Sequence, residues 1–327
     1  HQLTYEDSQT EYRSVFNHMI QKQTNHLLNE INDSKKIENK MIGCAAIILT
    51  GLAYKNKKQY LDAGLNIFKN ITKSSIDNHG FTKSRNIREL IFYLKYCIII
   101  REWFKESQNL VPECVEEAIY YLGSSYAFVW QNIKQDIFFN GNYSSENEEF
   151  DHYLKRFGYT FKNQISELGG YTILKNKKII LAADIGSSPN KIFSNDYQAG
   201  ALSFEIFSND KKLISNAGYY PDKNNKLNKL SRSTSLHNTL AIEDYSSCNF
   251  SKVKNNLIIN NGLKVSKKNI VFENNYWKIS AAHDGYLIKF GVNYEREIEF
   301  YPEQMKFVGH EKLNRKTANK EIKFDIR

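Results

Sequence analysis

Two polar loops in the first half of the chain hold side chains whose types suit anion binding and proton transfer. Residues 77–86 carry His79, Arg85 and Asn86, and residues 138–143 carry Asn140 and Tyr143. An arginine can pair with a carboxylate through two hydrogen bonds, and histidine or tyrosine can exchange a proton with a ligand. Polar loop residues are usually only solvated, but two such loops that meet at one rim of a fold form a site.

A second group of candidates lies in the other half of the chain. His283 and Tyr286 flank an Asp-Gly pair, which is itself a strong turn signal, so a purely structural role is the alternative. The remaining isolated histidines are predicted to be surface or helix residues; they are His18, His26, His152 and His310.

The length and charge of the chain limit the kinds of partner that it is expected to bind. The chain has 327 residues, enough for two domains, and a formal charge of +9. A basic surface suits an acidic polysaccharide, nucleic acid or a membrane. The alternative is that the positive charge reflects only a drift in base composition, which also makes turns rich in lysine. No basic block and no RRM, KH or zinc-finger pattern occurs, so nucleic-acid binding rests on charge alone. The longest apolar run, near Cys97, is bounded by Lys95 and Arg101 and is too short to span a membrane.

The cysteines and the first residue of the chain allow two further predictions. The four cysteines have no CxxC spacing, and Cys44, Cys97 and Cys114 lie in apolar helical stretches, so they are predicted to be core residues. Because residue 1 is histidine, the chain is predicted to be a fragment or a processed form.

Up to about residue 160, apolar residues recur at helical spacing and predict five helices. Their stripes run through residues 15–31, 41–52, 60–68, 87–98 and 115–133. Asp33-Ser34 is expected to cap the second helix, and Pro112-Glu113 to open the fifth. Long helices with short links indicate stacked hairpins, from which a superhelix or toroid is inferred.

After that point the pattern changes to short alternating runs separated by Asn, Gly and Lys turns. Residues 171–174 and 179–184 flank one such turn, and Asn260-Asn261-Gly262 is a further hairpin signal. Regular hairpins without helices predict an antiparallel β-sandwich. The predicted fold class is therefore α+β and multidomain, with a helical domain at 1–160 and a sandwich at 161–327, both incomplete.

Several segments, in consistent order, resemble the heparinase II/III-like family. Residues 197–205 (YQAGALSFE), 213–218 (LISNAG) and 232–240 (RSTSLHNTL) resemble its LSFE strand, its D-x-G turn and its HNT segment. His283-Asp284-Gly285-Tyr286, ahead of Arg296, is similar to its HDGY…R segment. In the first half, residues 80–86 look like the family's active-site loop, and Phe139-Asn140-Gly141 looks like the FNG that closes its helical domain.

The resemblance implies an α/α toroid packed on the sandwich, and a bacterial polysaccharide lyase. Such an enzyme cleaves an acidic, uronate-containing polymer by β-elimination in the cleft between the domains. It must neutralise the uronate carboxylate, remove the C5 proton and protonate the departing C4 oxygen. The residues implied as catalytic are Arg85, His79, Tyr143 and His237. Those implied as substrate-binding are Asn86, Asn140, Gln198, His283, Tyr286 and Arg296.

The chain departs from the family pattern at several of these positions. His79 stands where relatives have Asp, and Thr82 stands where they have His. His237 matches a histidine that helps hold a structural zinc in relatives, but the other ligand positions are Gln198 and Asn216, with Gly200 at a following Asp position. Gln and Asn are poor zinc ligands, so no metal or other cofactor is expected. The three side chains are instead expected to form one hydrogen-bonded polar cluster.

Asp196 occupies the place of a catalytic histidine in active lyases. That substitution supports the alternative interpretation, a glycan-binding or scaffolding protein that kept the fold and lost the chemistry. In either case the expected partner is an acidic poly- or oligosaccharide, without nucleic acid or a membrane span. A periplasmic or otherwise extracytoplasmic location is expected, because polymer-degrading lyases meet their substrate outside the cytoplasm. The sequence makes no prediction of the oligomeric state.

Overall fold

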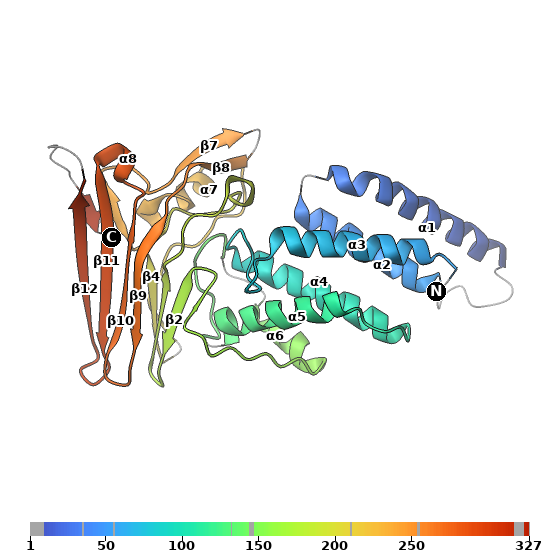
Figure 1. Ribbon diagram of the computed structural model, residues 1–327, viewed down its shortest axis with the longest axis horizontal. Coiled ribbons are helices and arrows are strands. Elements are labelled where there is room, and N and C mark those ends of the chain that lie inside the picture. The colour runs from blue at the N-terminus through green and yellow to red at the C-terminus, as the bar shows by residue number, and fades with distance from the viewer. Residues whose placement is uncertain are drawn as a thin grey trace. The chain divides into compact units, whose positions relative to one another are not determined.

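A computed structural model describes residues 10–34, 36–54, 56–131, 133–143, 147–209, 211–253, 256–316 and 324–326 (Figure 1). Its contacts divide the chain into two compact units, one of residues 1–77 and 91–122 and the other of residues 78–90 and 123–327. The first unit is helical, and all strands of the described residues lie in the second. The predicted fold class, helices followed by an antiparallel β-sandwich, is confirmed.

Five long helices occur where the apolar periodicity predicts them. They are α1 (Thr10–Glu30), α2 (Ile37–Ala53), α3 (Lys58–Ser75), α4 (Ile87–Glu106) and α5 (Glu113–Tyr126). α2 and α3 approach closely because Gly51 has no side chain: a Cβ there would lie 2.5 Å from the backbone nitrogen of Leu61. The predicted cap of α2 is wrong, since Asp33 ends a separate 3-10 turn and Lys36 precedes the helix without a side-chain capping bond.

A sixth helix, α6 (Asn147–Arg156), lies outside the predicted set. Its sequence is mostly polar, and the sequence pattern there resembles an acidic loop. Phe150 and Leu154 are its buried apolar side chains, and their spacing of four residues places both on one face of the helix. Two anchors are enough to hold a short helix against a core, but they are too few to produce a periodic signal.

The second unit contains two principal antiparallel sheets. The first has the order β1-β2-β3-β4-β5 and the second the order β12-β11-β10-β9. The strands of the first are β1 (Glu167–Leu168), β2 (Tyr171–Lys175), β3 (Ile179–Asp184), β4 (Phe204–Ser208) and β5 (Lys211–Ile214). Those of the second are β9 (Val265–Phe272), β10 (Trp277–His283), β11 (Val292–Tyr301) and β12 (Lys306–Arg315). Two smaller pairs accompany them: β6 (Leu240–Ile242) with β13 (Phe324–Ile326), and β7 (Asn249–Val253) with β8 (Asn256–Asn261).

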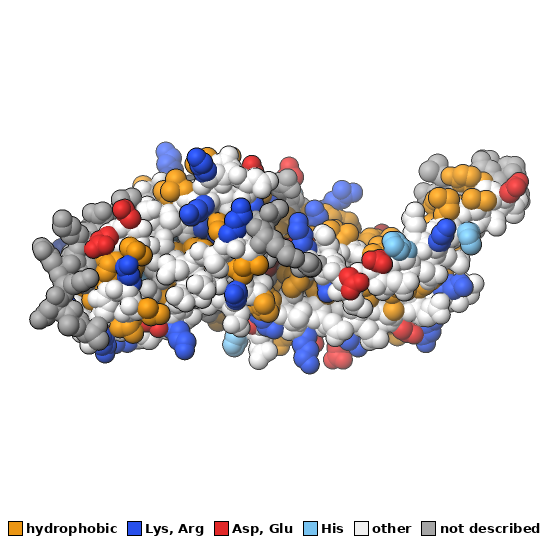
Figure 2. All heavy atoms as spheres, turned by 90° about the horizontal axis from the view of Figure 1, so that it is seen from above, with side chains coloured by type: hydrophobic (Ala, Val, Ile, Leu, Met, Phe, Trp, Pro, Cys, Tyr) orange, Lys and Arg blue, Asp and Glu red, His pale blue; other side chains and the backbone are white. Residues whose placement is uncertain are grey.

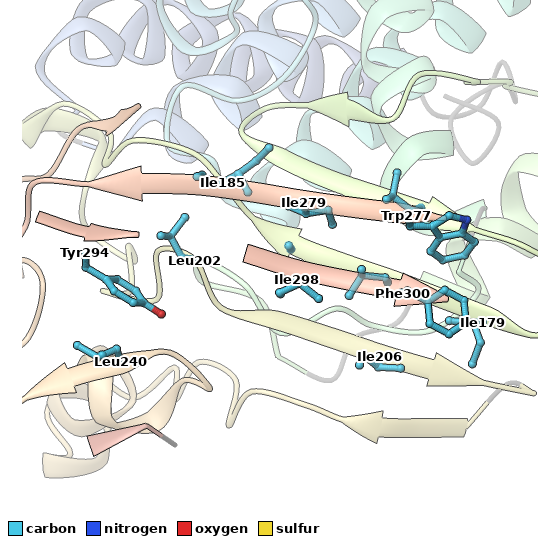
Figure 3. Packing of buried hydrophobic residues seen from close by; sticks show 14 of the residues in the cluster. Ile179, Ile185, Leu202, Ile206, Leu240, Trp277, Ile279, Tyr294, Ile298 and Phe300 are labelled. Atoms are coloured by element: carbon cyan, nitrogen blue, oxygen red, sulfur yellow. The ribbon is translucent and has the colours of Figure 1, made fainter. Parts of the chain in front are cut away.

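The core of this unit lies between the two sheets. Leu181 and Ile206 from the first sheet share one buried apolar cluster with Trp277, Ile279 and Ile298 from the second, and Figure 3 shows how side chains of this cluster face each other. β11 alternates strictly between buried and half-buried residues, as expected of a strand with one face on the core. The sandwich thus supplies a rigid support for the loops at its edge.

The surface carries charged side chains of both signs. On the face seen in Figure 2, lysine and arginine side chains are scattered among acidic ones and do not gather in one block. Within the described part of the chain, no helix combines the length and apolar character that crossing a bilayer requires.

Candidate functional site

The two polar loops singled out from the sequence meet on β3, and residues 78–86 of the first and all of the second belong to the second unit. Arg85 of the first loop donates to Oδ1 of Asp184 at 2.5 Å, and Asn140 of the second donates to Oδ2 of the same carboxylate at 2.9 Å. The loops also touch directly, because a Cβ on Gly141 would lie 2.4 Å from Nδ2 of Asn86. The expectation that the loops converge is therefore met by their contacts.

Arg85 is buried and uses its whole guanidinium internally. Besides Asp184, its nitrogens donate to the carbonyl oxygens of Gly169, Gly170, Gly186 and Ser187 at 3.0–3.1 Å. These five bonds match the five N–H donors of an arginine. The catalytic role expected for Arg85 stays a prediction, but this geometry favours a supporting role, since no donor remains for a ligand carboxylate.

Asn86 and Asn140 are likewise engaged in holding the backbone. The Oδ1 atom of Asn86 accepts from the backbone N–H of Arg88 at 2.9 Å, so Asn86 caps the start of α4. The Nδ2 atom of Asn140 donates to the hydroxyl of Tyr171 at 2.7 Å as well as to Asp184. Both were expected to bind substrate; both are buried, and their substrate-binding roles stay predictions.

Next to this junction, five side chains form a continuous row that we call the Arg88 cluster: Arg88, Tyr143, Tyr219, Asp196 and Lys223. The guanidinium of Arg88 lies 4.0 Å from the ring centroid of Tyr143, and the rings of Tyr143 and Tyr219 are 6.5 Å apart. The hydroxyl of Tyr219 donates to Asp196 at 2.9 Å, and the ammonium of Lys223 lies 2.8 Å from the same carboxylate oxygen.

The Arg88 cluster is accessible at both ends. Arg88 and Tyr143 are half-buried, and the side chains of Asp196 and Lys223 are 25% and 37% exposed. Among the described residues, the guanidinium of Arg88 makes the contact with Tyr143 but no hydrogen bond and no ion pair. A half-buried cation with unused donors is suited to a carboxylate-bearing ligand.

Proton chemistry in the cluster is shaped by Tyr219. Burial, followed by the nearby Asp196 carboxylate, raises the pKa of Tyr219 above its ordinary value. Tyr219 is therefore protonated at neutral pH, with its proton directed at Asp196. The hydroxyl of Tyr143 has no hydrogen-bond partner within the described ranges and is free to meet a ligand.

Gln198 joins the loops to the sandwich through its amide. Its Oε1 accepts from the backbone N–H of Gly141 at 3.0 Å, and its Nε2 donates to the carbonyls of Gly218 and Ser231 at 3.2 and 2.6 Å. The predicted hydrogen-bonded cluster of Gln198, Asn216 and His237 is wrong. Asn216 uses its Oδ1 on the backbone of Asn238, and neither ring nitrogen of His237 has a hydrogen-bond partner among the described residues.

These contacts also test whether the zinc ion that the family resemblance implies would fit. The side-chain oxygens of Gln198 and Asn216 accept hydrogen bonds from backbone N–H groups. Of the three residues, only His237 therefore offers a metal-ligand atom without a hydrogen bond among the described residues. A Cβ on Gly200 would lie 2.9 Å from Nδ1 of His237, so a carboxylate side chain at that position has no room without a shift. The residues present do not fit a zinc ion, which needs about four good ligands.

His283, Tyr286 and Arg296 form a separate buried network at one end of the second sheet. His283 accepts from the backbone N–H of Gly285 at 3.1 Å, and Tyr286 donates to the carbonyl of Leu240 at 2.7 Å. Arg296 pairs with Glu311 at 2.7 Å and donates to two backbone carbonyls. Their substrate-binding roles stay predictions; their observed contacts are structural. His79, the remaining expected residue, is exposed in the loop ahead of Arg85.

Two buried histidines predict a specific loss of stability in acid. Burial lowers the pKa of His237 to about 4 and that of His283 to about 3, both below the ordinary value of about 6.5. The folded state thus favours the neutral form, and its stability is complete above pH ~6.5 and declines as the pH falls through that value. We expect a decrease of up to about 1.4 kcal/mol per pH unit for each histidine.

The measurement is the urea midpoint between pH 7 and pH 5, a window above the range in which most carboxylates titrate. A His237→Gln variant is expected to show a shallower pH slope than the parent, whatever its absolute stability. Equal slopes in the two proteins would contradict the assignment.

Three members of the Arg88 cluster were not anticipated: Arg88, Tyr219 and Lys223. Arg88 lies in the first turn of α4, where charged residues are common and carry no special signal. Tyr219 directly follows the turn at residues 213–218 on which the family resemblance rests, so its position was a usable signal.

The chain is similar to known proteins in part of its sequence and in its fold. Residues 166–327 match the family model "Heparinase II/III-like, C-terminal". Among solved structures, the chain is similar to the heparan sulfate lyase HepC from Pedobacter heparinus, with a TM-score of 0.64 and 14% identity over 84% of this chain and 45% of that one. It is also similar to a heparinase III, with a TM-score of 0.65 and 17% identity over 93% and 51% of the two chains.

These similarities show the fold. At 13–17% identity they do not carry activity, and the chain spans about half the length of the structures that it matches. No curated protein sequence matches the chain significantly.

Proposed function

Because the chain belongs to the heparinase II/III-like family through residues 166–327, we propose that it is a polysaccharide lyase-type protein for uronate-containing, acidic polymers. The observation that carries this proposal is the Arg88 guanidinium, which is stacked on Tyr143 with its donors unused among the described residues. A planar cation beside an aromatic ring is a suitable receptor for a carboxylate carried on a sugar ring.

The chemistry that we propose is β-elimination. Arg88 and Lys223 neutralise the uronate carboxylate, which makes the C5 proton removable. Tyr219 takes that proton while its own proton passes to Asp196 over 2.9 Å. The electron pair left at C5 forms the C4–C5 double bond as the C4–O bond breaks, and Tyr143 protonates the departing oxygen. The raised pKa of Tyr219 is the reason for a relay, because a free phenolate is not populated at neutral pH.

A second candidate is a glycan-binding protein that lacks the chemistry. It is favoured by one observation: the Asp196 carboxylate is already engaged by Lys223 and Tyr219, and the Arg88 cluster contains no imidazole. In that case Arg88, Tyr143 and Lys223 bind the polymer and no bond is cleaved.

One experiment separates the two. The protein is incubated with heparin, heparan sulfate and alginate, and the ultraviolet absorbance of the unsaturated uronate product is followed while binding is measured by calorimetry. Rising absorbance on one polymer supports the lyase, and binding without absorbance supports the second candidate. The absence of both on every polymer would overturn the proposal.

We further propose that the fold is independent of zinc. If a structural zinc contributed, its removal would cost about 4 kcal/mol at a metal concentration roughly 1,000 times the dissociation constant. We therefore expect the thermal midpoint to be unchanged by excess EDTA. Glu297, Glu299 and His310 present ligand atoms within 4.8 Å of one another on the outer face of β11 and β12, so a His310→Gln variant is the control for metal bound there. A midpoint that falls with EDTA in both proteins would contradict the prediction.

The expected partner follows from the proposed substrate: an acidic poly- or oligosaccharide. An extracytoplasmic, and specifically periplasmic, location follows from the same proposal, since such polymers are met outside the cytoplasm. Fractionation of expressing cells tests it directly.

A further inference from the structure

Asp184 and Tyr171 are buried side chains with no place in the proposed chemistry, yet both bridge the same two loops. They lie directly opposite each other on β3 and β2. Asp184 accepts from Arg85 and Asn140 at 2.5 and 2.9 Å. The hydroxyl of Tyr171 donates to the backbone carbonyl of Arg85 at 2.6 Å and accepts from Nδ2 of Asn140 at 2.7 Å. Two independent bridges thus connect one pair of residues.

Each bridged residue precedes a member of the Arg88 cluster by three positions. Arg85 is followed by Arg88, and Asn140 is followed by Tyr143. The connection on the first side is stiff, because Asn86 caps the first turn of α4. On the second side, Asn142 closes a turn onto the carbonyl of Phe139 and holds the carbonyl of Ile137 through its side chain. A displacement at either bridge is therefore transmitted to Arg88 or Tyr143.

The backbone at both bridges is strained. Arg85 has φ 62° and Asn140 has φ 34°, in the left-handed region that residues other than glycine rarely adopt. Such conformations persist only where surrounding contacts enforce them, and they concentrate near functional sites. Asp184 and Tyr171 provide those contacts here.

We infer that Asp184 and Tyr171 are positioning residues, which hold the two loops so that Arg88 and Tyr143 are stacked before the ligand arrives. The inference rests on the proposed function for the identity of the ligand. That Asp184 and Tyr171 hold the two loops in place is its mechanical part, which does not depend on the ligand. Pre-organisation of this kind matters because a misplacement of about 1 Å costs roughly 100-fold in rate.

The test uses Tyr171→Phe, which removes one hydroxyl and leaves the ring that packs between Phe81 and Phe139. Its matched control is Tyr294→Phe, which removes a buried hydroxyl bonded to Glu311 in the same unit. Hydrogen exchange of the segments 78–90 and 137–143 is measured in both variants, together with thermal midpoints. In Tyr171→Phe both segments are expected to exchange roughly tenfold faster, and in Tyr294→Phe neither segment changes.

The functional readout is the kcat/KM, or the affinity if the protein only binds. Tyr171→Phe is expected to lower it about tenfold or more at a thermal midpoint similar to that of the control. Asp184→Asn is expected to show the larger effect of the same kind, and Tyr171→Phe remains informative if Asp184→Asn does not fold.

The outcomes separate the two proposals. Unchanged exchange in both loop segments of Tyr171→Phe overturns the positioning inference, whatever the parent protein binds. Faster exchange with no glycan activity or binding in the parent supports the mechanical part and overturns the proposed function instead. Faster exchange with an unaltered kcat/KM also overturns the inference, because the loops would then move without consequence for the site.

Discussion

Arg88→Ala is expected to lower kcat/KM on the preferred polymer by about 100- to 1,000-fold with little change in stability. The loss is large because, in the proposed mechanism, the guanidinium neutralises a carboxylate whose negative charge increases as the C5 proton leaves, and such donors act mainly in the transition state. Stability is little affected because the guanidinium of Arg88 makes no hydrogen bond or ion pair within the described residues, and the backbone N–H that donates to Asn86 is kept in the variant. The measurement is steady-state kinetics, or the glycan dissociation constant for a protein that only binds.

The matched control is Arg156→Ala. Arg156 is an exposed arginine at the end of α6 whose guanidinium lies 6.0 Å from the ring of Phe157, so it shares the cation–aromatic geometry but lies outside the Arg88 cluster. Its replacement is expected to leave kcat/KM within about twofold, since surface substitutions away from a site have small effects. Arg88→Lys is expected to recover part of the activity, because it restores the charge but not the planar fork. Equal effects of the Arg88 and Arg156 substitutions would mean that general surface charge, and not this site, attracts the polymer.

Arg232→Met is expected to destabilise the protein by about 3–5 kcal/mol, a loss at the upper end of what a single substitution causes. Arg232 is 1% exposed and donates to the carbonyls of Ser194, Tyr197 and Leu257 at 2.7–2.8 Å. Burial lowers the pKa of Arg232 to about 10, yet the side chain stays charged at neutral pH. Methionine fills a similar volume but removes the donors to all three carbonyls, although the Ser194 carbonyl still accepts from the backbone N–H of Tyr197 at 3.3 Å.

Thermal unfolding checks this prediction. For a unit of this size a loss of about 1 kcal/mol lowers the midpoint by about 2–4 °C, so a decrease on the order of 10 °C is expected. Lys229→Met on α7 (Lys226–Ser231) is the control, because Lys229 is exposed and its replacement is expected to change stability by less than about 0.5 kcal/mol. A midpoint of Arg232→Met that matches this control would show that water or rearranged backbone satisfies the three carbonyls.

The fold class was predictable because its signals are local. Apolar spacing in α2 through α5 and alternation in β11 reflect the period of a helix or strand against a core, which neighbouring residues alone produce. α6 escaped prediction for the same reason, since two buried anchors make no periodic pattern. From the sequence, we could say only that the two loops would form a site if they met. The contact of Arg85 with Asp184, by which they do meet on β3, joins residues 99 positions apart.

The different contacts of Arg85 and Arg88 show what could be determined from the sequence and what could not. Residue type and family resemblance identified the loop, Arg85 as the expected cation and Tyr143 as the expected tyrosine, because these choices depend only on the chemical type of each residue and on its place in the sequence. Which of two arginines in one segment faces a ligand depends on what surrounds each of them. The guanidinium of Arg85 donates to Asp184 and to four carbonyls from distant segments, whereas the guanidinium of Arg88 lies over the ring of Tyr143 and makes no hydrogen bond or ion pair among the described residues. Burial and pairing are properties of the packed chain, so only the tertiary structure decided that the N–H donors of Arg85 are used internally while those of the Arg88 guanidinium are unused among the described residues.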